Sequence, residues 1–216
     1  MLDLYALLLL EEGARTNLTS KADREALYQK HIVTSLAILR ALEDACVTLS
    51  PALDVGSGAG FPGLPIKIVR PEIEMTLLEA TGKKTSFLES AVGALKLDGI
   101  RVIQARAEDL ARDPEHRGAY NLVLARAVAP LPVLLELTLP FLAPNGVLAA
   151  PKGSARQREV AESASALATL GGTIEATLPL QIPGPGPQQA LVLVRKTGPT
   201  PDKYPRRPGI PAKRSL

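Results

Sequence analysis

The residues best suited to chemistry in this sequence are a glycine-rich segment, Gly56–Gly63, and the acids around it. The segment reads Gly-Ser-Gly-Ala-Gly-Phe-Pro-Gly and directly follows the short apolar stretch 52–55. Glycines let a backbone turn sharply and approach a ligand closely, and free N–H groups at a helix start attract its polar groups. This pattern predicts a cofactor-binding loop. No Lys-Ser or Lys-Thr pair follows the glycines, so a phosphate-cradling P-loop is excluded.

Two acids distinguish between the cofactors that such a loop binds. The spacing from Gly58 to Gly63 fits the dinucleotide pattern GxGxxG, and Glu79 follows about 20 residues later, where a carboxylate can hold a ribose. Asp54 lies beside the loop, where its charge would oppose a diphosphate. S-adenosylmethionine carries a sulfonium and an ammonium group and no phosphate, so Asp54 together with Glu79 favours S-adenosylmethionine over NAD.

The elements that position these residues follow from the hydrophobic periodicity. We expect strands at 52–55, 75–79, 101–104, 121–124, 147–150, 174–178 and 190–194, with helices at 23–45, 83–97, 132–142 and 156–170. This alternation predicts an α/β fold with a mostly parallel sheet, helices on both faces and an antiparallel edge hairpin. Ligands bind at the carboxyl ends of strands in such sheets. The loops after residues 55, 79, 105, 125 and 150 should therefore form the site.

Composition and length limit the class of protein. The chain has 216 residues, 46% hydrophobic and 22% charged, which fits one folded domain with appendages. We divide it into a helical region, 1–48, a Rossmann-like domain, 49–196, and a Pro-rich basic tail, 197–216. A single cysteine and no Cys/His cluster predict neither a disulfide nor a metal site. Without a signal peptide or an uninterrupted apolar span, we expect a cytoplasmic protein away from membranes.

The positive charge is concentrated in the tail. The net charge is +3, while residues 197–216 alone hold five Lys or Arg and one Asp. With seven Phe and Tyr residues and no Trp, a surface of stacked aromatic rings for nucleic acid is not expected. The prolines predict an extended tail whose cations are available to RNA phosphates. The alternative is a tail that only improves solubility. These cations are Lys203, Arg206, Arg207, Lys213 and Arg214.

Several stretches in order resemble one known family. They are Asn17-Leu18-Thr19-Ser20, His31, LDVGSGAGFPGLPI at 53–66, LLEATGKKTSFL at 77–88, ARAEDL at 105–110, LARAVAP at 124–130 and the pair Lys152-Gly153. On these residues the chain resembles the small-subunit ribosomal RNA guanine-N7 methyltransferases, also called the glucose-inhibited division protein B family. The resemblance spans about residues 15 to 196.

The resemblance implies a class I, Rossmann-like methyltransferase fold with S-adenosylmethionine as methyl donor. It implies a guanine N7 of small-subunit (16S) ribosomal RNA as target. Carried over by position, Gly56 and Phe61 line the methionine side of the cofactor, and Arg126 faces the site. The implied ribose residues are Glu79, Ala80, Thr81 and Gly82, and the implied adenine residues are Ala107 and Glu108. Read from the sequence alone, Glu108 is equally compatible with an exposed acid that opens a helical turn.

The proposed reaction needs few catalytic groups. Guanine N7 has a lone pair and no proton, so the enzyme must align the reactants in a water-poor pocket rather than supply a base. Arg126 and Lys152 are the candidates nearest the guanine, because its N7 and O6 accept hydrogen bonds from Arg or Lys. The alternatives are an Arg126 paired with Asp54 or Glu79, and a solvated Lys152. His31 is expected to be a hydrogen-bonded core residue.

Positively charged side chains are the candidates for contacts with the substrate. Lys83 and Lys84 follow the expected ribose residues and either contact RNA phosphate or form a solvated helix face. Together these residues predict a monomeric methyltransferase acting on small-subunit ribosomal RNA or on the ribosomal subunit. Two alternatives stay open at this point: an NAD-dependent oxidoreductase on the same sheet, and a non-catalytic RNA-binding protein that keeps the fold.

Overall fold

The structure is a computed structural model that describes residues 1–16, 28–183 and 188–216. Its seven strands form one sheet in the order β3-β2-β1-β4-β5-β7-β6. The strands are β1 (Ala52–Val55), β2 (Met75–Glu79), β3 (Ile100–Gln104), β4 (Tyr120–Leu124), β5 (Leu142–Lys152), β6 (Gly172–Pro179) and β7 (Ala190–Lys196). The helices are α1 (Leu2–Thr16), the π-helix η1 (Tyr28–Val33), α3 (Thr34–Asp44), α4 (Gly63–Val69), α5 (Gly82–Leu95), α6 (Ala107–Leu110), α7 (Leu131–Thr138), the 3-10 helix η2 (Leu139–Phe141), α8 (Arg156–Glu162), α9 (Ala164–Leu170) and α10 (Ile210–Lys213).

The sheet is mostly parallel, as the alternation of elements predicts. Strands β1 to β5 pair in parallel, whereas β7 runs antiparallel to both β5 and β6. The central strands β1 and β2 are buried at every residue, because helices cover both faces of a parallel sheet. Strand β6 alternates half-buried and exposed residues, as an edge strand does. The expected fold class is confirmed.

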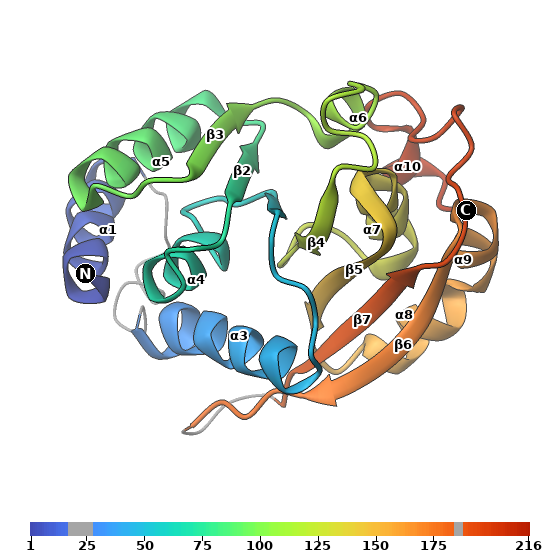
Figure 1. The fold of residues 1–216 in the computed structure, drawn as a ribbon, viewed down its shortest axis with the longest axis horizontal. Helices are drawn as coiled ribbons and strands as arrows, with labels where there is room; N and C mark the ends of the chain where they lie inside the picture. The colour runs from blue at the N-terminus through green and yellow to red at the C-terminus, as the bar shows by residue number, and fades with distance from the viewer. Residues whose placement is uncertain (17–27, 184–187) are drawn as a thin grey trace.

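The core lies in two layers, one on each face of the sheet. Successive strand residues point to opposite faces, so Leu77 joins the layer under α1, α3, α4 and α5, while Leu78 joins the layer under α6, α7 and α9. Figure 1 shows these two groups of helices on either side of the sheet. The carboxyl ends of β1, β2, β3 and β4 consequently share one edge, where the glycine segment begins.

Several element boundaries differ from the prediction. Strand β5 begins at Leu142, five residues before the expected start, because η2 with Pro140 ends the preceding helix early. The helix expected over 156–170 divides into α8 and α9 at Ser163, whose hydroxyl donates to the Glu159 carbonyl at 2.6 Å. Residues 23–27 of the first expected helix lie outside the described part. Its described remainder consists of η1 and α3.

The extended C-terminal tail is a prediction that the structure overturns. The segment from 197 to 216 folds back onto the domain and ends in the short helix α10. Tyr204 is 8% exposed and packs into the second core layer. The Arg206 guanidinium forms a bidentate ion pair with the fully buried Glu136 of α7. A buried carboxylate needs such a partner, and local sequence patterns do not reveal a partner this distant.

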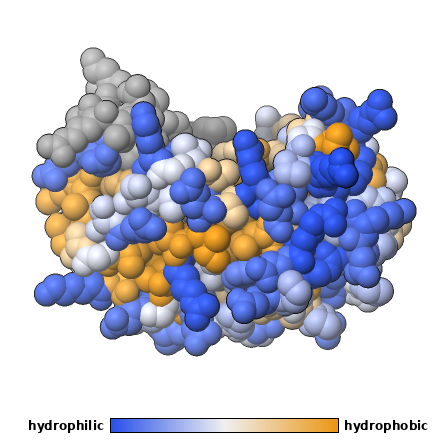
Figure 2. Space-filling view, turned by 90° about the horizontal axis from the view of Figure 1, so that it is seen from above, coloured by the Kyte–Doolittle hydropathy of each residue, from blue (hydrophilic) through white to orange (hydrophobic). Residues whose placement is uncertain are grey.

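Helix α1 packs one face against the domain and leaves the other bare. Tyr5 and Leu9 are fully buried, whereas Leu4, Leu7 and Leu10 on its outer side are 40 to 56% exposed. Figure 2 shows hydrophobic residues gathered over the half of the molecule that carries α1 and α5, and hydrophilic ones over the half that carries α6 and the C-terminus. In the described part of the chain, no helix is long and apolar enough to span a membrane.

Candidate active site

The glycine segment forms a tight loop tied to the neighbouring strand. The N–H groups of Gly56 and Ser57 both donate to the Leu78 carbonyl, at 2.8 and 3.1 Å, so the loop after β1 is fixed to the end of β2. Gly56, Gly58 and Gly60 have φ of +70°, +60° and +100°. Side chains other than glycine rarely adopt these values, which explains the residue type at three of the four glycine positions.

The glycines of this loop differ in what surrounds them. A Cβ on Gly60 would lie 2.5 Å from the Leu64 side chain, and one on Gly63 would lie 2.6 Å from Leu77, so both glycines allow close internal packing. A Cβ on Gly58 would have only the Gly56 carbonyl within 4 Å, at 3.9 Å. Gly58 therefore borders open space. The loop presents its backbone to a ligand at this position.

Asp54 lies beneath the loop instead of facing it. Its side chain is fully buried, and Oδ2 accepts a hydrogen bond from the Gly63 N–H at 3.0 Å. Oδ1 has no hydrogen-bond partner within the described residues. Burial raises the pKa of this carboxyl to about 7, against the lowering effects of the Gly63 and Ser57 hydrogen bonds and the nearby Arg126. Asp54 thus fixes the start of α4, a position different from the cofactor-facing one that the sequence suggested.

Helix α1 reaches the same loop from the opposite side. The Tyr5 hydroxyl donates to the Ala59 carbonyl at 2.5 Å, and its ring packs against Phe61 with centroids 5.6 Å apart. Burial, followed by the charge of Asp54, raises the pKa of Tyr5, so it stays a neutral donor. Sequence reasoning missed this residue, because nothing local to an N-terminal helix indicates a contact 54 residues away.

The expected ribose residues come together at the end of β2. Glu79 is 6% exposed, and its two carboxylate oxygens accept the N–H groups of Gly58 at 3.0 Å and Thr81 at 2.8 Å. Ala80 and Thr81 are exposed beside it, and Gly82 begins α5. The Glu79 carboxylate therefore ties the glycine loop to the loop after β2, at the edge of the open space beside Gly58.

Arg126 enters the same edge from β4. Its Nη2 is hydrogen-bonded to Nδ1 of His31 at 3.0 Å, and the His31 ring stacks on Phe61 with centroids 4.8 Å apart. The following residue, Ala127, has φ of +55°, a strained value for a residue with a side chain and one often found at functional sites. His31 is hydrogen-bonded, as expected. Its partner nevertheless places it in the candidate site rather than in an independent core.

Lys152 bonds to the turn after Arg126. Its side chain is 10% exposed, and Nζ donates to the Ala129 carbonyl at 2.7 Å and pairs with Glu159 at 2.8 Å. The same Glu159 oxygen accepts the N–H of Leu131 at 2.7 Å. Lys152 and Glu159 thus fix both sides of the turn after Arg126. This arrangement corrects both sequence-based interpretations of Lys152, as a guanine contact and as a solvated lysine.

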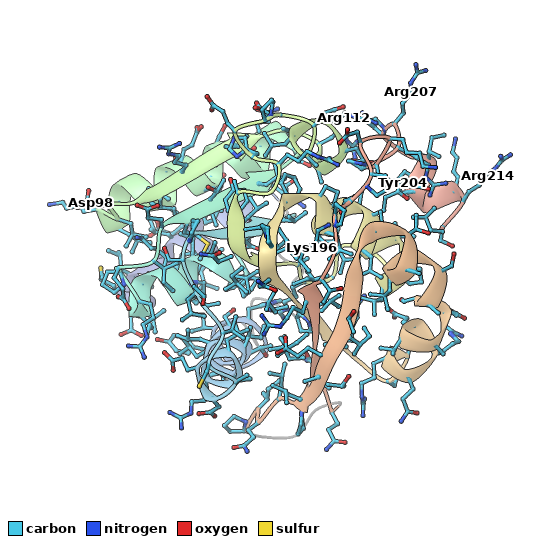
Figure 3. All side chains as sticks on the ribbon, turned by 45° about the vertical axis from the view of Figure 1, so that its right-hand side comes forward. Asp98, Arg112, Lys196, Tyr204, Arg207 and Arg214 are labelled. Atoms are coloured by element: carbon cyan, nitrogen blue, oxygen red, sulfur yellow. The ribbon has the colours of Figure 1, made fainter. Side chains whose placement is uncertain are left out.

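The remaining predicted site residues lie in α6, at the start of α5 and in the C-terminal tail. Glu108, with Ala107 in α6, is 9% exposed, and its Oε1 accepts the Gly209 N–H from the C-terminal segment at 3.1 Å. Lys83 is exposed and Lys84 half-buried at the start of α5. Of the tail cations, Arg206 is committed to Glu136. The exposed ones are Lys203, Arg207, Lys213 and Arg214, and Figure 3 shows Arg207 and Arg214 pointing outward.

Within the described residues, no group of three or more His, Cys, Asp or Glu side chains gathers as metal ligands would. The chemistry available at this edge is hydrogen bonding, charge and exclusion of water. Its polar groups come from the ends of four neighbouring strands. That arrangement offers hydrogen-bonding groups of both kinds to an organic ligand.

Known proteins resemble this chain over nearly its whole length. Residues 1–182 match the family model described as rRNA small subunit methyltransferase G. The chain is 44% identical to ribosomal RNA small subunit methyltransferase G of Pelotomaculum thermopropionicum, covering 98% of this chain and 88% of that protein. It is 46% identical to the protein of the same name from Roseiflexus castenholzii, over 94% and 85% of the two chains.

The fold also has counterparts among solved structures. A structure described as a putative sarcosine dimethylglycine methyltransferase from Galdieria sulphuraria superposes with a TM-score of 0.58 at 13% identity. The match covers 76% of this chain and 85% of that one. At this identity the likeness concerns the fold alone.

Proposed function

The chain belongs to the rRNA small subunit methyltransferase G family, and from this premise we propose that it methylates N7 of a guanine in small-subunit ribosomal RNA. The methyl donor is S-adenosylmethionine. The observation that carries the assignment of the site is the loop at the end of β1, where Gly58 borders open space and Glu79 holds the neighbouring N–H groups.

The residues at this edge fit the donor in charge and shape. Glu79 gives the site an acid, which suits the cationic donor better than a diphosphate, and Asp54 supports the loop from beneath. We propose that Gly56, Gly58 and Phe61 line its methionine part. The ribose would lie against the segment from Glu79 to Gly82, and the adenine against Ala107 and Glu108. When bound, S-adenosylmethionine supplies a methyl group activated by the adjacent sulfonium.

The chain's own contribution is alignment. Guanine N7 carries no proton, so no residue has to remove one, and the rate depends on holding the base in place and excluding water. Arg126 is the cation at the end of β4 beside Phe61 and His31, where it can donate to O6 of guanine and leave the N7 lone pair free to attack the methyl group. Lys152 is a positioning residue, because it fixes the turn that follows Arg126.

Membership of the family favours this function over the two alternatives that the sequence left open. An NAD-dependent oxidoreductase and a non-catalytic RNA-binding protein share the fold class, yet the chain's relatives are named as methyltransferases over nearly its whole length. We further propose that the enzyme works in the cytoplasm as a monomer. RNA would contact Lys83, Lys84 and the exposed cations of the tail, which are Lys203, Arg207, Lys213 and Arg214.

The assignment of the loop is tested by substituting Gly58. Asparagine tolerates a positive φ, so Gly58→Asn should fold, while its side chain enters the open space and weakens S-adenosylmethionine binding at least tenfold. Gly118→Asn is the matched control, since Gly118 also has a positive φ, +67°, and a Cβ there would meet only a carbonyl at 4.0 Å. Calorimetric titration gives both affinities.

Mapping of methylated guanines in small-subunit RNA treated with the wild-type enzyme identifies the target.

If Gly58→Asn binds S-adenosylmethionine as tightly as Gly118→Asn does, the cofactor lies elsewhere. If the wild-type enzyme leaves every small-subunit guanine unmodified, the proposed reaction is wrong.

A further inference from the structure

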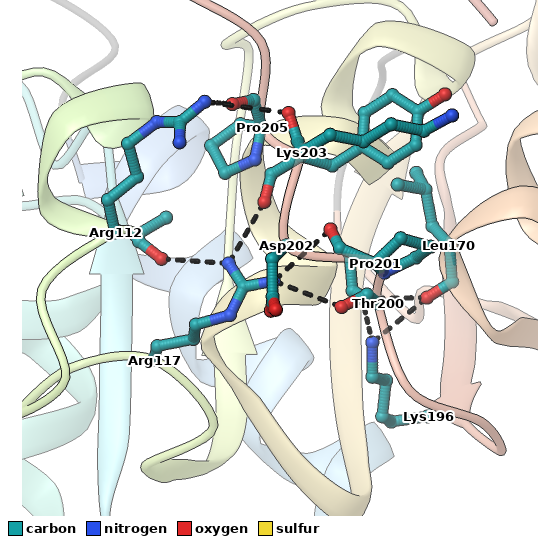
Figure 4. A network of polar contacts seen from close by, with 11 residues as sticks. Arg112, Arg117, Leu170, Lys196, Thr200, Pro201, Asp202, Lys203 and Pro205 are labelled. Atoms are coloured by element: carbon teal, nitrogen blue, oxygen red, sulfur yellow. Dashed lines mark hydrogen bonds and ion pairs between the residues drawn. The ribbon is translucent and has the colours of Figure 1, made fainter.

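The C-terminal segment, residues 197–216, is held against the domain by hydrogen bonds to its backbone. Arg117 donates to the Thr200 and Tyr204 carbonyls at 3.0 and 2.9 Å, and Arg112 donates to the Pro205 carbonyl. Figure 4 shows these two guanidinium groups reaching the segment, with Lys196 bonded to Thr200 below them. Because these hydrogen bonds go to backbone carbonyls, they fix the path of the main chain and do not depend on the charged side chains of the segment.

A second set of contacts joins the segment to α7. Glu136 is 1% exposed, and its Oε1 accepts the backbone N–H of Arg206 at 2.7 Å in addition to the guanidinium. Tyr204 is buried in the same core layer as Leu110 and Leu134, which come from α6 and α7. The segment is therefore anchored to the loop that follows α6 and to α7.

The third contact reaches the candidate cofactor site itself. The Gly209 N–H donates to Oε1 of Glu108 at 3.1 Å. Gly209 has φ of +81°, a conformation that directs the chain into α10. Glu108 follows β3 and is the acid proposed to lie beside the adenine. Its rotamer is thus fixed by a residue 101 positions away.

Helix α6 needs such support. It has four residues, Ala107–Leu110, and a helix this short is not stable by itself. Its orientation must come from tertiary contacts, and these are packing on α7 together with the bonds of the segment. Arg117 links the two directly, because one of its nitrogens donates both to Ala111, at the end of α6, and to Tyr204.

We propose that the C-terminal segment is a positioning element of the cofactor site, which holds α6 and the Glu108 carboxylate against the adenine. The proposal rests on the function proposed above and extends it from the glycine loop to the far side of the cofactor. It differs from the sequence-based interpretation, in which the tail is extended and its cations are available to RNA phosphates.

The test uses the full chain with single substitutions at Gly209. Gly209→Pro removes the donor N–H and cannot adopt a positive φ. Gly209→Asn is the matched control, because it keeps the N–H, tolerates the conformation and meets no atom within 4 Å of its Cβ. Neither substitution changes a charge. Arg112→Ala, at an exposed residue, is a second way to loosen the segment, should Gly209→Pro fold poorly.

We expect the Kd for S-adenosylmethionine to rise about tenfold in Gly209→Pro, the size of one hydrogen bond to a charged acceptor. Arg112→Ala should raise it severalfold, and Gly209→Asn should stay within twofold of wild type. In steady-state assays on small-subunit RNA, the KM for S-adenosylmethionine should rise in Gly209→Pro while kcat at saturating S-adenosylmethionine is retained.

The proposal is overturned if Gly209→Pro and Arg112→Ala bind S-adenosylmethionine as tightly as wild type. It is equally overturned if Gly209→Asn is as impaired as Gly209→Pro, or if kcat falls with KM unchanged. A wild-type enzyme that does not bind S-adenosylmethionine would instead contradict the proposed function, so the two failures are distinguishable.

Discussion

At the scale of single residues, burial changes the acid–base chemistry of Asp54. Its pKa rises from 3.8 to about 7, chiefly because the charged form loses its hydration. Between these two values the folded protein binds more protons than the unfolded chain. Stability contributed by this group therefore falls as pH rises through that window, the reverse of an ordinary salt-bridged acid.

The expected consequence is a change in pH dependence when the charge is removed. Asp54→Asn keeps an oxygen that can accept the Gly63 N–H but cannot ionise, so the decline of stability between pH 4 and pH 7 should flatten. At pH 8 the variant should have the higher free energy of unfolding, by about 2 to 4 kcal/mol. Urea denaturation at pH 5 and pH 8 measures both effects.

Asp98→Asn is the matched control, because Asp98 is exposed (Figure 3) and should leave the pH dependence of wild type intact. An Asp54→Asn protein whose stability declines with pH as steeply as wild type would show that Asp54 is charged throughout.

At the scale of elements, α1 is hydrogen-bonded to the glycine loop through the Tyr5 hydroxyl. Tyr5→Phe keeps the ring against Phe61 and removes the donor to the buried Ala59 carbonyl. We expect a loss of about 1 to 3 kcal/mol in stability, the cost of a buried acceptor left without its partner. The loop then loses a constraint, and the Kd for S-adenosylmethionine should rise severalfold. Thermal unfolding and calorimetric titration give the two quantities.

Tyr28→Phe is the control on the neighbouring helix. Tyr28 is 44% exposed, and its hydroxyl bonds to Asp3 at the surface, so its loss should change little. Equal cofactor affinities in Tyr5→Phe and Tyr28→Phe would show that α1 only covers the sheet and does not shape the loop.

At the scale of the whole molecule, the free cations of the tail should set the salt dependence of RNA binding. Arg206 is neutralised by Glu136, whereas Arg207, Lys213 and Arg214 are exposed. Replacing these three by Gln should lower the slope of log affinity against log salt by up to about 2 to 3, since each phosphate contact contributes about 0.7 to 0.9. Binding of a small-subunit RNA fragment at several KCl concentrations measures the slope.

The matched variant replaces three exposed cations away from the site edge, Arg40, Lys96 and Arg101. Should both triple variants lose the same slope, RNA contact would not be localised to the C-terminal segment, and only net charge would matter.

The sequence by itself determined the fold class, the strand positions and the glycine loop. These features depend on local properties: apolar runs and their periodicity mark strands and helices, and Gly58 needs a positive φ that its own residue type reveals. Glu79 was predictable for the same reason, because the last residue of a parallel strand lies at the ligand-binding edge whatever the rest of the chain does.

Only the tertiary structure decided which charges are available and which are committed. Arg206 pairs with Glu136 across 70 residues, Glu108 bonds to Gly209 across 101, and Lys152 holds a carbonyl 23 residues before it. A lysine or arginine has the same residue type whether it lies in solvent or beside a buried acid. The difference is the free energy of burying that acid without a partner, and it arises only when distant segments pack together.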